Sequence, residues 1–123
     1  MTLVTLVTGA HMAAREAALV ATIDTAVSTA LILEGMPDGS NRLDGLGAKD
    51  TLRIVRIAPG CPCCVGNLTL RVTLNRILRR PPVRLYISLA DDTHLDQIRG
   101  FLSAPPYDAL LTLTDVMHCH DTE

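Results

Sequence analysis

Three of the four cysteines in this chain of 123 residues lie within the run Cys61-Pro62-Cys63-Cys64, which glycines frame on both sides. Thiolates are soft ligands that suit zinc and copper(I) and, less well, cobalt or nickel, and the glycines allow the backbone to curl around an ion. We therefore predict a site for zinc or another divalent transition metal made by Cys61, Cys63 and Cys64. Two alternatives are thiol redox chemistry, through Cys61 with Cys63 or with Cys64, and inert packing.

A tetrahedral site needs a fourth ligand, and the last residues of the sequence offer candidates. His118, Cys119 and His120 carry imidazole and thiol groups. These groups could complete the site if the last strand ends near the cysteine loop. The alternative is a frayed tail, since terminal residues are commonly poorly ordered.

Short apolar runs alternate with helical patterns along the chain. We expect strands at residues 3–8, 29–33, 52–57, 83–89 and 109–116, and helices at 12–27, 67–80 and 93–102. Strands that alternate with helices predict an α/β fold with three layers, in which helices flank a mostly parallel sheet of about five strands. Arginines alternate with aliphatic residues at 52–57, which indicates a strand near a sheet edge. The turn at Gly9, the cysteine loop and residues 118–120 should then meet at the carboxyl edge of the sheet.

The composition limits the size and the partners of the protein. The length predicts a single domain, 1–123, whose core consists almost entirely of aliphatic residues because the chain has no Trp, two Tyr and one Phe. A net charge of −2 disfavours broad binding to nucleic acid or to an anionic membrane. We find no signal peptide and no segment apolar enough to span a bilayer, so we expect a cytoplasmic protein whose thiols are reduced.

The order of these elements resembles a known family. Residues 57–64, Ile-Ala-Pro-Gly-Cys-Pro-Cys-Cys, precede a leucine-rich helix. They resemble the loop of the CobW-like branch of the GTPase metallochaperones, whose mark is Gly-Cys-x-Cys-Cys between a strand and a helix. Residues 3–9 are similar to the family's first strand and the start of its phosphate loop, and residues 31–34, 84–91 and 107–116 are similar to later strands. The resemblance implies a fold of the P-loop NTPase type, a transition-metal site at the cysteines and hydrolysis of GTP.

The phosphate loop departs from the family's pattern. A working loop reads G-x-x-x-x-G-K-[S/T], because glycine amides cradle phosphate, lysine neutralises it and the hydroxyl holds magnesium. Alignment on Gly9 places Ala14, Arg15 and Glu16 where Gly, Lys and Ser/Thr belong. Ser88 or a neighbour stands where the family has Glu, and no Asn/Thr-Lys-x-Asp segment that could read guanine is found. We therefore predict a degenerate phosphate loop and do not expect GTP to bind.

These observations favour a non-enzymatic, metal-binding CobW-like protein that acts in metal homeostasis as a chaperone, a buffer or a regulatory partner. The expected partners are the metal ion and a second copy of the chain, a full-length family member or a client metalloprotein. Two alternatives remain. One is a metallochaperone that binds and hydrolyses GTP through a divergent phosphate loop, and the other is a thiol redox module.

Overall fold

The computed structural model describes residues 2–9, 12–24, 26–35, 51–57, 65–89 and 95–119, with only the backbone described at 65–68. The strands are β1 (Thr2–Gly9), β2 (Thr29–Glu34), β3 (Leu52–Ile57), β4 (Arg84–Ser88), β5 (Leu111–Leu113) and β6 (Met117–Cys119). The helices are α1 (Met12–Thr22), α2 (Val65–Ile77), α3 (Leu95–Leu102) and the short 3-10 helix η2 (Tyr107–Ala109).

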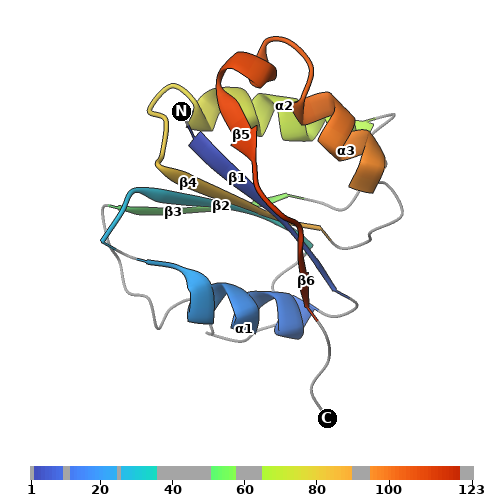
Figure 1. Cartoon of the computed structure of the whole chain (residues 1–123). Coiled ribbons are helices and arrows are strands. Elements are labelled where there is room, and N and C mark those ends of the chain that lie inside the picture. Colours follow the sequence, from blue (N-terminus) through green and yellow to red (C-terminus); the bar gives the residue numbers. More distant parts are fainter. Residues whose placement is uncertain are drawn as a thin grey trace.

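All six strands belong to one sheet, in which every described pair is parallel. Their order is β3-β2-β4-β1-β5, and β6 also pairs with β1. Helix α1 covers one face of this sheet, and α2 and α3 cover the other (Figure 1). The predicted α/β fold with a mostly parallel sheet flanked by helices is confirmed, and β3 lies at an edge as its arginines predicted.

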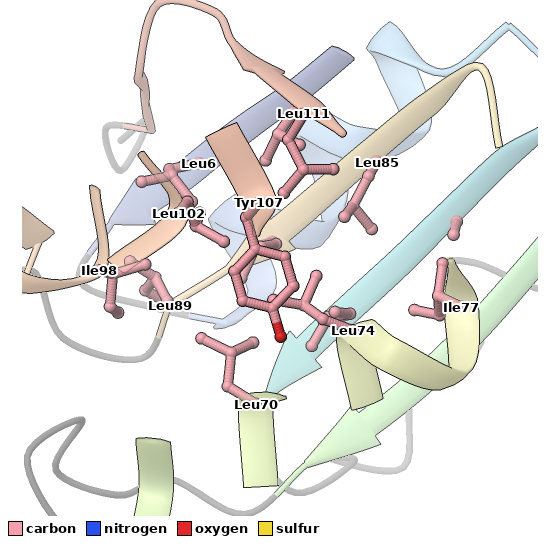
Figure 2. Close-up of a cluster of buried hydrophobic side chains, with 14 residues drawn as sticks. Leu6, Leu70, Leu74, Ile77, Leu85, Leu89, Ile98, Leu102, Tyr107 and Leu111 are labelled. Carbon is pink, nitrogen blue, oxygen red and sulfur yellow. The ribbon is translucent and has the colours of Figure 1, made fainter. Parts of the chain in front are cut away.

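The central strands β1, β2 and β4 are buried at almost every position because both of their faces are covered. Alternate residues of β4 therefore enter different cores: Leu85 and Ile87 pack in the larger core under α2 and α3, and Tyr86 packs in the smaller core under α1. Leu70, Leu74 and Ile77 of α2 join the larger core (Figure 2). Their helical spacing is the pattern that predicted this helix.

The last strand differs from the prediction of one strand over 109–116. β5 and β6 run one after the other along the same side of β1, separated by residues 114–116. Val4 pairs with Leu113, but Val7 pairs with Met117, so the last segment contains one more residue than β1 over the same length. An extra residue of this kind produces a bulge that interrupts the ladder of hydrogen bonds.

Two helices also end earlier than predicted. Helix α1 ends at Thr22 and not at residue 27, because the Asp24 side chain accepts a hydrogen bond from Ala26 N at 2.9 Å and forms a turn. Helix α2 begins at Val65 and ends at Ile77, where the prediction was 67–80. None of the described helices is long and apolar enough to cross a membrane.

We expect Leu74→Ala to lower the free energy of unfolding by about 2–5 kcal/mol, because it leaves a cavity in the larger core. The Leu74 side chain is 0% exposed. Val72→Ala is the matched control, since Val72 is on the same helix and 49% exposed, and we expect it to change stability by at most about 0.5 kcal/mol. Urea unfolding monitored by circular dichroism measures both, and equal losses would contradict the assignment of the core face of α2.

Candidate metal site at the carboxyl edge of the sheet

The carboxyl ends of five parallel strands meet at one edge of the sheet, which we call the carboxyl edge. β1 ends at Gly9, β2 at Glu34, β3 at Ile57, β4 at Ser88 and β6 at Cys119. Ligands of open parallel sheets bind outside this edge.

The predicted cysteine ligands Cys61, Cys63 and Cys64 lie outside the described residues, as does His120. The flanks of their loop are described: β3 ends at Ile57, and α2 begins at Val65. Within the described part of the chain, no group of three His, Cys, Asp or Glu side chains could hold a metal ion. The metal site therefore stays a prediction.

His118 and Cys119 belong to β6 and pair with the end of β1. Thr8 Oγ1 lies 2.9 Å from His118 Nδ1, and the two residues are partners in the register. Gly9 is the partner of Cys119, and a Cβ at Gly9 would lie 2.8 Å from the Cys119 carbonyl oxygen. Burial raises the pKa of the Cys119 thiol, and the nearby Arg15 guanidinium opposes this rise.

Arg15 is buried, although it stands where a phosphate-binding lysine is expected. Its Nε donates a hydrogen bond to Ser88 Oγ at 2.9 Å, and its Nη1 donates one to the Gly9 carbonyl at 2.8 Å. Burial lowers the pKa of Arg15, while Glu16, Glu34 and Cys119 raise it in part. The side chain ties the first turns of α1 to the ends of β1 and β4.

Glu16, which stands where a magnesium-binding hydroxyl is expected, is also buried. Its Oε1 accepts a hydrogen bond from Arg56 Nη2 of β3 at 3.3 Å. The Glu16 side chain is 3% exposed and that of Arg56 is 28% exposed, so the pair spans the boundary between the α1 layer and solvent. Among the described residues, neither Glu16 Oε2 nor Arg56 Nη1 has a hydrogen-bond partner.

Sequence reasoning did not find three residues of this edge. Arg56 was noticed only as part of an edge strand, and Ser88 only as a departure from the family's pattern. Glu34 closes β2 and is the register partner of Ile57, from which the chain continues toward the cysteines. A carboxylate at the end of an apolar strand is a signal that could have marked Glu34 as a further candidate ligand.

Comparison with known proteins finds a similarity to a zinc chaperone. A stretch of 77 residues, 61% of this chain, is 36% identical to the zinc chaperone YeiR of Escherichia coli (strain K12), a member of the CobW family. Over this stretch the chain is similar to a protein of the CobW family. The resemblance predicted from the cysteine loop is thus confirmed.

The chain spans about a quarter of the relative that it matches, since the shared stretch makes up 24% of that protein. No protein-family model matches the chain. No solved structure matches it either.

We expect Gly9→Ala to lower the free energy of unfolding by about 1–3 kcal/mol, the usual cost of overpacking. The new Cβ would lie 2.8 Å from the Cys119 carbonyl oxygen, and a backbone atom cannot swing aside as a flexible side chain can. Gly100→Ala is the control: a Cβ at Gly100 meets nothing within 4 Å, and alanine favours the helix by about 1 kcal/mol. Chemical denaturation measures both variants, and a neutral Gly9→Ala would contradict the close packing of β1 on β6.

Proposed function

We propose that this CobW-like chain binds zinc, or another divalent transition metal, through Cys61, Cys63 and Cys64, that it lacks a competent nucleotide site, and that it acts in metal homeostasis. The observation that carries the proposal is the similarity to a zinc chaperone in a chain that contains a Gly-Cys-x-Cys-Cys motif. Three thiols at this density are a suitable donor set for zinc, because thiolates are soft ligands and structural zinc sites are commonly rich in cysteine.

The geometry at the carboxyl edge supports a fourth ligand from the protein itself. Glu34 ends β2 beside Ile57, and the cysteine motif begins four residues after Ile57. His118 and Cys119 end β6 on the far side of β1 from β4. Because β2 is the direct neighbour of β3, we propose Glu34 as the fourth ligand in preference to His118 and Cys119.

The partners of Arg15 and Glu16 support the absence of a nucleotide site. To bind a phosphate, the Arg15 guanidinium would have to release Gly9 O and Ser88 Oγ, and leaving a buried group such as the Ser88 hydroxyl unpaired costs about 1–3 kcal/mol. The Glu16 carboxylate is buried against Arg56 and adds a negative charge where a triphosphate would place its own.

We expect the chain purified under reducing, chelator-free conditions to contain about one zinc per site, and Cys63→Ser and Cys64→Ser each to abolish zinc binding. Affinity should rise with pH, because zinc displaces the thiol protons. Elemental analysis and competition with a chromophoric chelator measure both. Cobalt substitution reports thiolate coordination by its charge-transfer absorption.

Cys119→Ser is the matched control, and we expect it to keep zinc. Glu34→Gln should weaken zinc binding without abolishing it if Glu34 is the fourth ligand. Unchanged zinc content in both the Cys63 and the Cys64 variants would refute the proposed site. A reversible disulfide among the same cysteines, together with little metal, would favour the redox alternative.

We expect no saturable GTP binding on the same sample up to about 1 mM, the upper end of common substrate affinities. Titration with a fluorescent GTP analogue measures this directly. Saturable binding that disappears in Arg15→Met would show that the divergent loop holds phosphate, and measurable turnover of GTP by the same sample would then establish the GTPase alternative.

A further inference from the structure

A second region of the molecule has the features of a binding site and contains none of the carboxyl-edge residues. A cavity of about 390 Å³ lies between α2, the end of α3 and the turn before η2. Arg71, Asn75, Phe101, Pro105, Pro106 and Tyr107 line it. Its volume lies in the range of small-ligand sites, about 300–1,000 Å³.

Aromatic and proline side chains form the apolar part of this cavity. Phe101 and Tyr107 lie with their ring centroids 5.1 Å apart at an interplanar angle of 58°. They are two of the three aromatic residues in the chain, and because Tyr107 is only 3% exposed, most of the aromatic surface in the cavity belongs to Phe101. The Tyr107 ring has a fixed position, since it is buried in the larger core, to which Leu74 of α2 also belongs (Figure 2).

The polar part of the cavity comes from two neighbouring residues of α2. Arg71 and Asn75 are four positions apart, so their side chains lie on the same face of the helix. The Arg71 guanidinium is 5.5 Å from the centroid of the Phe101 ring, which holds a positive charge above the apolar surface. Among the residues that the structure describes, no other charged side chain lines the cavity.

A hydrogen bond orients Asn75. Tyr107 Oη donates to Asn75 Oδ1 at 2.8 Å, which leaves the NH₂ group of the Asn75 side chain to donate to a ligand. Burial raises the pKa of Tyr107, with Arg71 opposing the rise, and the hydroxyl stays a donor at neutral pH. Arg71 and Asn75 thus present a cation and an N–H donor side by side.

We propose that this cavity binds a carboxylate carried on a flat apolar or aromatic body. The carboxylate accepts charge-assisted hydrogen bonds from Arg71 and a further one from Asn75, and the body packs between the aromatic rings and Pro105 and Pro106. A free aromatic acid and the C-terminal aromatic residue of a peptide share this chemistry.

The test compares phenylacetate with phenylacetamide, which has the same shape without the charge, by NMR titration of the intact chain. A probe of about ten heavy atoms should bind with about millimolar affinity. We expect saturable shifts at Phe101 and Tyr107 with phenylacetate and affinity at least about tenfold lower for the amide. A second arm uses acetyl-Gly-Gly-Phe with a free or an amidated C-terminus to separate the two ligand sources.

Variants identify the site. Arg71→Met should weaken phenylacetate binding by about tenfold or more, and Asn75→Ala should weaken it severalfold. Arg76→Met is the charge-matched control, because Arg76 is exposed on the same helix and does not line the cavity, and it should bind as the parent chain does. Equal affinity for acid and amide, unchanged binding in Arg71→Met, or no saturable shift with any probe would each overturn the proposal. These readouts involve no metal, so they are independent of the zinc experiments.

Discussion

The parallel pairing of β1 on both sides is the constraint on which the rest of the structure depends. β4 pairs with residues 3–7 of β1 on one side, and β5 and β6 share the other side before and after the bulge. This pairing brings Gly9, Ser88 and Cys119 together at the carboxyl edge. The close approach of β6 leaves no space for a Cβ at Gly9, so the glycine at the start of the phosphate-loop pattern is needed for strand packing whether or not phosphate binds.

In the first turns of α1, Arg15 and Glu16 stand at the positions that bind phosphate and magnesium in a phosphate loop, but they serve the packing of the helix instead. A phosphate loop keeps a cation and a hydroxyl open to an incoming ligand. Here Arg15 and Glu16 find their partners within the protein, in Gly9, Ser88 and Arg56. Buried charged groups need such partners, because an unpaired ion in the interior carries a large desolvation cost. These contacts make the arginine and the glutamate part of the packing between α1 and the sheet.

The sequence predicted the larger features of this fold and missed those that depend on contacts between distant residues. Alternation of apolar runs and helical patterns was enough for a parallel sheet flanked by helices, and the strand at 52–57 has the predicted ends. The bulge at 114–116 was missed because Thr, Asp and Val in this order do not break a strand pattern. The partnership of Glu16 with Arg56 was missed because it depends on which face of the sheet α1 covers. Cys61, Cys63 and Cys64, the predicted metal ligands, lie outside the described residues, so that part of the site stays a prediction.

The edge strand β3 leads into the cysteine motif, and two arginines anchor it to both helical layers. Arg53 and Arg56 are three positions apart, so their side chains point to opposite faces of the sheet. Arg56 binds Glu16 on the α1 side. Arg53 donates hydrogen bonds on the α2 side to the carbonyls of Ile77 at 3.4 Å and Arg80 at 2.5 Å, at the end of that helix. A strand with one neighbour would otherwise depend on β2 alone, and these contacts give β3 a defined position relative to the sheet and to both helical layers up to its last residue, Ile57.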